Sequence, residues 1–222
     1  MKETKKKIYN LIVLDESGSM SSDKATVISN INELIEDIKL QAKENKDIKQ
    51  YISLITFNGM GIQTVLDCEK AKEAAPLTDK HYNPRSLTPL YDAMGNAIQN
   101  LRKKLKDNSN VITTVFTDGM ENSSKEFDEN TLKKIIEELE NKHWSFTYVG
   151  ADHDVVKQAS RLKISKAMRF SKTKEGFKES LDVQKKYREK INSMIIEDVQ
   201  LSESLKLKIW EESVKESNED NK

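Results

Sequence analysis

The feature that most constrains this chain is a regular alternation of short apolar runs with longer segments of helical periodicity. The apolar runs cover residues 8–14, 51–57, 110–119 and 144–151, and segments with helical spacing cover 24–45, 90–105, 129–141 and 153–162. A continuous apolar run is typical of a strand buried on both faces. Strands that alternate with helices form mostly parallel sheets covered on both sides. The sequence therefore predicts a doubly wound, Rossmann-like α/β fold.

Two further segments complete the predicted sheet. The turn sequence "NGMG" at 58–61 separates the strand 51–57 from another apolar stretch at 62–68, which favours an antiparallel hairpin. The short run "AMRF" at 167–170 is a candidate last strand. We therefore expect six strands, one of them an antiparallel edge strand, with helices on both faces.

The domain organisation follows from the length and from the end of the chain. A chain of 222 residues suggests one domain, or one domain with an appendage. We assign residues 1–195 to the domain, ending in a helix over 175–195, and 196–214 to a C-terminal helical extension. In that extension Leu201, Leu205, Ile209 and Trp210 share a helical face, which either packs on the domain or binds a partner. The polar tail at 215–222 is predicted to be disordered.

Charge and cysteine content exclude several classes of function. Lys+Arg and Asp+Glu are both 37, so the formal net charge is zero, and a general nucleic-acid or anionic-membrane binder needs excess positive charge. No apolar stretch approaches the ~18 residues of a membrane span. Cys68 is the only cysteine, so no internal disulfide can form. These features predict a cytoplasmic protein.

Oxygen-bearing side chains follow the predicted strands where a doubly wound sheet binds ligands, beyond the carboxyl ends of its strands. Asp15, Ser17 and Ser19 follow the first strand, Thr88 precedes the helix at 90–105, and Asp118 ends the strand at 110–119. Taken alone, the first three residues suit a tight turn that caps a helix. All five together form an oxygen-only set suited to Mg²⁺ or Mn²⁺.

Three motifs in this set resemble the von Willebrand factor A family. "DESGSM" resembles its D-x-S-x-S signature, "SLTPLYDA" its threonine loop and "VFTDGMENSS" its aspartate loop, in the family's order along the chain. The resemblance implies a metal-ion-dependent adhesion site, or MIDAS. Ser17 and Ser19 would bind the ion directly, and Asp15 would act through water or anchor the loop. Thr88 would bind directly when an acidic ligand is engaged, and Asp118 directly or through water.

Two details refine this resemblance. Ser86 stands where the family usually has glycine, which is expected to stiffen the threonine loop. "TPLYDAMGNAI" and "YVGADHDV" are similar to stand-alone bacterial vWA proteins, including those of tellurium-resistance and stress operons.

The resemblance implies a non-enzymatic binding module, in which bound Mg²⁺ or Mn²⁺ engages an Asp or Glu of a partner protein. One alternative is a metal-dependent phosphohydrolase, but Ser17 stands where that chemistry usually wants a second acidic residue, and no glycine-rich phosphate loop is present. Another alternative is a subunit of an ATPase or chelatase assembly. The sequence does not indicate the oligomeric state.

Overall fold

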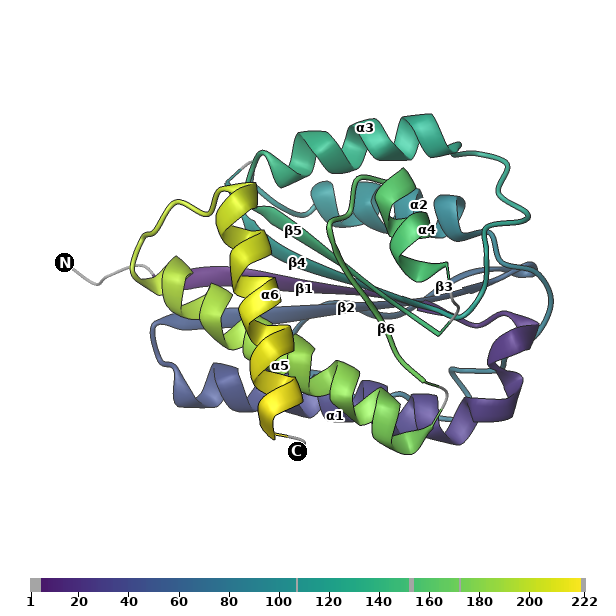
Figure 1. Cartoon of the computed structure of the whole chain (residues 1–222), viewed down its shortest axis with the longest axis horizontal. Coiled ribbons are helices and arrows are strands. Elements are labelled where there is room, and N and C mark those ends of the chain that lie inside the picture. Colours follow the sequence, from purple (N-terminus) through teal and green to yellow (C-terminus); the bar gives the residue numbers. More distant parts are fainter. Residues whose placement is uncertain (1–4, 107, 152–153, 172, 221–222) are drawn as a thin grey trace.

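A single six-stranded sheet with the strand order β3-β2-β1-β4-β5-β6 forms the centre of the molecule (Figure 1). This computed structural model describes residues 5–106, 108–151, 154–171 and 173–220. All neighbouring strands are parallel except β2 and β3, which are antiparallel. The predicted fold class, including the antiparallel edge strand, is therefore confirmed. The strands are β1 Lys6–Asp15, β2 Ile48–Asn58, β3 Gly61–Lys70, β4 Asn110–Thr117, β5 Trp144–Gly150 and β6 Lys166–Arg169.

Helices cover both faces of this sheet (Figure 1). One face carries α2, α3 and α4, and the other carries α1 and α5, with α6 packed on α5. No helix of the described part is both long and apolar enough to cross a membrane. The helices are α1 Lys24–Glu44, α2 Leu90–Arg102, α3 Glu129–Glu140, α4 Val155–Arg161, α5 Lys174–Ile196 and α6 Glu203–Asp220, with short 3-10 helices η1 Gly18–Asp23 and η2 Ala71–Glu73.

The central strand β1 explains why its sequence is apolar throughout. Leu11 and Val13 lie in the core beneath α2 and α3, whereas Ile12 and Leu14 lie in the core beneath α1. Successive side chains of a strand point to opposite faces, so a strand covered on both sides needs apolar residues at every position. This burial fixes the strand end that carries Asp15.

The C-terminal helix α6 differs from the sequence prediction in its length. The segment 196–214 does contain a helix, and Ile209 and Trp210 lie in a core cluster shared with α5. The helix continues to Asp220, however, so the prediction of a disordered tail is wrong for residues 215–220, while 221–222 lie outside the described residues. Composition alone suggested disorder, but the acidic side chains of this last turn pair with lysines of α5, as in Lys190–Glu216.

Candidate metal centre

Three loops meet at the carboxyl ends of β1 and β4. The two strands are direct neighbours, with Leu14 paired in register to Phe116, so the residues that follow them lie at the same edge of the sheet. A backbone hydrogen bond of 3.0 Å from Gly18 N to Ser86 O joins the loop after β1 to the loop before α2. The fold therefore brings together three loops that lie around residues 15–19, 88 and 118 of the chain, as the five predicted side chains require.

Asp15 is fully buried, and protein donors occupy both of its carboxylate oxygens. Ser17 N–H donates to Oδ1 at 2.7 Å, and the Thr117 hydroxyl donates to Oδ2 at 2.6 Å. Burial raises the pKa of Asp15 to about 6, against the opposing effect of the hydrogen bonds from Thr117 and Ser17, and nearby Asp118 raises it further. A cation nearby would favour the charged form of such a carboxylate.

The two serines and Asp118 form a continuous chain of oxygens. Ser17 Oγ lies 3.1 Å from Ser19 Oγ, and Ser19 Oγ lies 2.5 Å from Asp118 Oδ1. Neighbouring oxygens around an octahedral Mg²⁺ with bonds of about 2.1 Å lie about 3.0 Å apart. The two oxygen–oxygen distances, 3.1 and 2.5 Å, lie on either side of that value. Small shifts of these side chains would therefore accommodate the ion.

Thr88 borders the same space, next to Gly119. A Cβ atom placed on Gly119 would lie 3.1 Å from Thr88 Oγ1 and 3.7 Å from Asp15 Oδ2. The missing side chain at Gly119 therefore leaves room between the threonine and the aspartate loop. Reciprocal contacts hold Thr88 there, because its N–H donates to Asn122 Oδ1 at 2.9 Å and its carbonyl accepts from Asn122 N at 3.2 Å.

The five predicted side chains are thus gathered at one edge of the sheet, and their chemistry fits a hard dication. They offer only oxygens, two from carboxylates and three from hydroxyls, which is the donor type that Mg²⁺ and Mn²⁺ prefer. Within the described part of the chain, no cluster of three or more His, Cys, Asp or Glu residues could hold a metal ion instead. A centre of this kind depends on hydroxyl groups.

Ser86 takes the conformation that glycine would adopt. Its φ is 67°, in the left-handed region that side chains other than glycine rarely occupy. Ser86 holds this conformation at a backbone cost of about 1–2 kcal/mol.

Sequence reasoning missed three residues that support the site. Thr117 holds Asp15 Oδ2, and its Oγ1 also accepts a hydrogen bond from Gly119 N at 3.1 Å. The Tyr82 hydroxyl donates to Asp15 O at 2.8 Å, and buried Glu16 accepts from Asn58 Nδ2 at 3.2 Å. Only Thr117 had a usable signal, since it immediately precedes Asp118. The other contacts join segments that the sequence does not place together.

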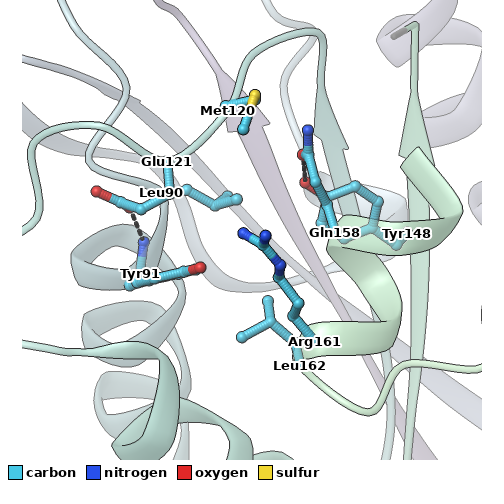
Figure 2. Close-up of a pocket in the computed structure, with 8 residues that line it drawn as sticks. All are labelled: Leu90, Tyr91, Met120, Glu121, Tyr148, Gln158, Arg161 and Leu162. Atoms are coloured by element: carbon cyan, nitrogen blue, oxygen red, sulfur yellow. Dashed lines mark hydrogen bonds between the residues drawn. The ribbon is translucent and has the colours of Figure 1, made fainter. Parts of the chain in front are cut away.

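A small pocket of about 60 Å³ lies next to the loop after β4, and Met120 and Glu121 of that loop help to line it (Figure 2). Arg161 of α4 extends into it (Figure 2). Among the described residues, none forms an ion pair with this guanidinium. Glu121 also lines the pocket, but its carboxylate accepts hydrogen bonds from Tyr91 N at 2.9 Å and from Ser124 N at 2.7 Å. Glu121 therefore braces α2 against the loop after β4, and the pocket is lined by one carboxylate and one guanidinium.

Comparison with solved structures supports the fold independently. A pilus adhesin, SpaC from Lactobacillus rhamnosus GG, aligns with a TM-score of 0.63 at 13% identity, covering 85% of this chain and 30% of that one. A von Willebrand factor type A protein from Catenulispora acidiphila gives 0.58 at 10% identity, covering 81% and 42%. The SpRpn10 VWA domain gives 0.53 at 10% identity, covering 79% and 94%. At these identities the likeness establishes the fold alone.

Sequence comparison identifies the family. No curated protein sequence matches this chain. The sequence model described as "von Willebrand factor type A domain" matches residues 11–186, which include all three loops of the candidate metal centre. The chain therefore belongs to the von Willebrand factor type A domain family.

Proposed function

We propose that this protein is a metal-ion-dependent protein-binding module. Its MIDAS-type centre would hold Mg²⁺ or Mn²⁺ and receive an Asp or Glu side chain of a partner protein. The observation that carries the proposal is the convergence of five oxygen-bearing side chains from three loops at the carboxyl edge of the sheet. They are Asp15, Ser17, Ser19, Thr88 and Asp118.

The hydrogen bonds of Asp15 suggest which side chains bind the ion directly and which support those that do. Both of its oxygens already accept protein hydrogen bonds, so Asp15 supplies negative charge and anchors the loop. Ser17 and Ser19 would bind the ion directly through neutral hydroxyls, with Thr88 and Asp118 completing the set. When bound, the ion supplies a positive charge that these ligands neutralise only in part. A partner's carboxylate is hard and anionic, and therefore suits the remaining position.

The neighbouring pocket offers a guanidinium to an acidic partner. Arg161 lines this pocket without an ion pair to the described residues, and an unpaired guanidinium attracts carboxylates near the surface. The solved structures include a protein described as a pilus adhesin and another described as a minor pilin. A role in protein contact agrees with these descriptions, and we propose neither a nucleic acid nor a membrane as partner.

We further propose a cytoplasmic, bacterial setting of the stand-alone type. The free thiol of Cys68 suits a reducing compartment. As a subunit of an ATPase or chelatase assembly, the second alternative, the protein would use the same site to bind another subunit.

Metal binding is the first test. Titration of Mn²⁺ into the wild-type protein and Ser19→Ala should show saturable binding that the variant loses. Ser21→Ala is the matched control, because the Ser21 hydroxyl donates to Gly18 O at 2.6 Å in the same short helix and lies outside the oxygen set. Equal Mn²⁺ affinity in all three proteins would show that the proposed centre does not bind the metal ion.

Partner binding is the second test. Proteins captured from the native cell in Mg²⁺ should be lost in EDTA. Thr88→Ala should weaken capture far more than it weakens Mn²⁺ binding, whereas Asp118→Ala should weaken both. Capture that survives both EDTA and Thr88→Ala would mean that the partner uses another surface.

The phosphohydrolase alternative has a direct assay. A generic phosphatase substrate, incubated with the protein in Mg²⁺ and then in Mn²⁺, should show no turnover above that of Ser19→Ala. Turnover that depends on Ser19 would favour the enzyme over the binding module.

A further inference from the structure

A second pocket, of about 410 Å³, is lined by five lysines. They are Lys39, Lys43, Lys49, Lys70 and Lys72, and we call this site the basic pocket. Its volume falls within the range of small-molecule sites, about 300–1,000 Å³. Because the chain has equal numbers of basic and acidic residues, such a concentration of lysines marks a local feature of the surface.

The basic pocket lies far from the candidate metal centre. It is built from the C-terminal end of α1, the first residues of β2 and the segment after β3. In the register of β1 and β2, Ile48 of the pocket lies opposite Lys6, whereas Phe57 lies opposite Asp15. The pocket is therefore at the amino-terminal edge of the parallel strands, and the metal centre is at the other edge.

The positive charge of the basic pocket is only partly compensated. Lys39 pairs with Glu36 at 2.6 Å, while Lys70 and Lys72 share Glu73 at 3.4 and 3.5 Å. Lys43 and Lys49 form no ion pair with any residue that the structure describes. Two carboxylates thus pair with three of the five lysines, which leaves excess positive charge among the residues that line the pocket.

A buried donor also lines this pocket. Gln50 is 3% exposed, and its Nε2 has no hydrogen-bond acceptor among the described residues. The hydrogen bonds determine which end of the Gln50 amide is the oxygen and which the nitrogen. Arg188 can only donate, and its Nη1 donates to Asn10 Oδ1 at 3.1 Å. Asn10 Nδ2 then donates to Gln50 Oε1 at 3.0 Å. The amide nitrogen of Gln50 is consequently left as a donor that needs an oxygen acceptor.

We propose that the basic pocket binds a small organic phosphate. Its phosphate groups would lie between Lys43 of α1 and Gln50, whose side chain lies on the face of β2 that α1 and α5 cover. Lys49 points to the opposite face and would reach them around the edge of β2 at residues 48–50, where β3 does not pair. Its apolar portion would pack against Ala42, Ile48 and Ala71, which also line the pocket. The site does not depend on the metal centre or on the proposed protein partner.

ATP, inorganic pyrophosphate and adenosine are suitable probes, titrated calorimetrically in EDTA so that no phosphate can bind through a metal ion. ATP should bind, pyrophosphate should bind more weakly and adenosine should not bind. The variant Lys43→Gln/Lys49→Gln should weaken ATP binding about ten-fold. The control Lys134→Gln/Lys178→Gln removes the same charge from exposed sites on α3 and α5, and should bind ATP as the wild type does.

Gln50→Glu gives an independent measurement, since it keeps the acceptor for Asn10 and replaces the orphan donor with a negative oxygen. It should reduce ATP affinity by at least the same factor, with folding checked by circular dichroism. The proposal is overturned if ATP does not bind, if both double variants bind it equally or if pyrophosphate binds as tightly as ATP. Tighter binding of a tetraglutamate peptide than of ATP would also overturn it, in favour of an acidic protein segment.

Discussion

Replacing Thr117 with valine tests whether the candidate metal centre is pre-organised by the protein. The substitution keeps the shape of the side chain and removes the hydroxyl. That hydroxyl donates to Asp15 Oδ2 at 2.6 Å and accepts from Gly119 N at 3.1 Å. Thr117→Val would leave a buried carboxylate oxygen and a backbone N–H without these partners.

The structure indicates the size of the effect. A hydrogen bond to a charged group contributes about 1.5–3 kcal/mol and one between neutral groups about 1 kcal/mol. We therefore expect the free energy of unfolding of the metal-free protein to fall by about 3 kcal/mol. Residues that orient a metal ligand typically change metal affinity 10- to 100-fold, so Mn²⁺ binding should weaken by about that factor.

Thr113→Val is the matched control on the same strand. Thr113 is also fully buried, but its hydroxyl has no hydrogen-bond partner in the described part of the chain. Its replacement should leave stability unchanged or increase it, and Mn²⁺ affinity should not change. Urea unfolding and Mn²⁺ titration measure both quantities. The reasoning is refuted if the two variants unfold alike, or if Thr117→Val loses stability while Mn²⁺ affinity stays at the wild-type value.

Three further substitutions probe other parts of the structure. Gly119→Ala should reduce Mn²⁺ affinity, because the added Cβ would lie 3.1 Å from Thr88 Oγ1. Gly18→Ala is the control: its Cβ meets only ordinary contacts, from 3.4 Å, and should leave Mn²⁺ affinity unchanged. Equal Mn²⁺ affinities of the two variants would contradict this prediction. Burial, with a hydrogen bond to Glu203, raises the pKa of Glu140 from 4.5 to about 7. The carboxyl group therefore stays protonated to a higher pH in the folded protein than in the unfolded chain. As the pH rises from about 5 to 8, the free energy of unfolding should fall by at most about 3 kcal/mol. Glu140→Gln should flatten this pH dependence in urea unfolding, and an unchanged slope would assign it to other groups. Trp210→Ala should lower the free energy of unfolding by about 3–5 kcal/mol, because this buried ring packs edge-on against Tyr187; a change below about 1 kcal/mol would show that α6 is dispensable.

The sheet could be predicted from the sequence because each strand and the hairpin turn leave a signal within a short stretch of residues. A strand buried on both faces requires a continuous apolar run, and a hairpin requires a turn signal, so β1, β2 and β3 could be identified from short windows. The five oxygen-bearing residues were identified for the same reason, because each follows or precedes such an element. Their convergence then follows from the parallel register of β1 and β4.

Buried charges were beyond sequence reasoning, because their partners come from distant segments. Arg188 lies in the polar stretch "QKKYREK" of α5, yet it is fully buried and its Nη2 donates to Thr114 Oγ1 at 2.6 Å. Lys206 of α6 is also buried, and its ammonium group donates to Glu140 O at 2.8 Å and to Trp144 O at 2.6 Å. Lysine and arginine in a helix are normally read as solvated, and no local pattern distinguishes these two.

The same long-range hydrogen bonds determine how a partner could affect the fold under the proposed function. Asp92 near the start of α2 accepts three backbone hydrogen bonds, from the N–H groups of Lys125, Glu126 and Phe127, at 2.8 to 2.9 Å. Thr88 lies immediately before α2 and is bonded to Asn122. The threonine loop, the start of α2 and the segment from 121 to 127 are therefore joined in one network. A carboxylate ligand that draws Thr88 toward the ion would therefore pull on this whole unit through these hydrogen bonds. Binding at the metal centre would then be transmitted to α2 only to the extent that the partner prefers the displaced state.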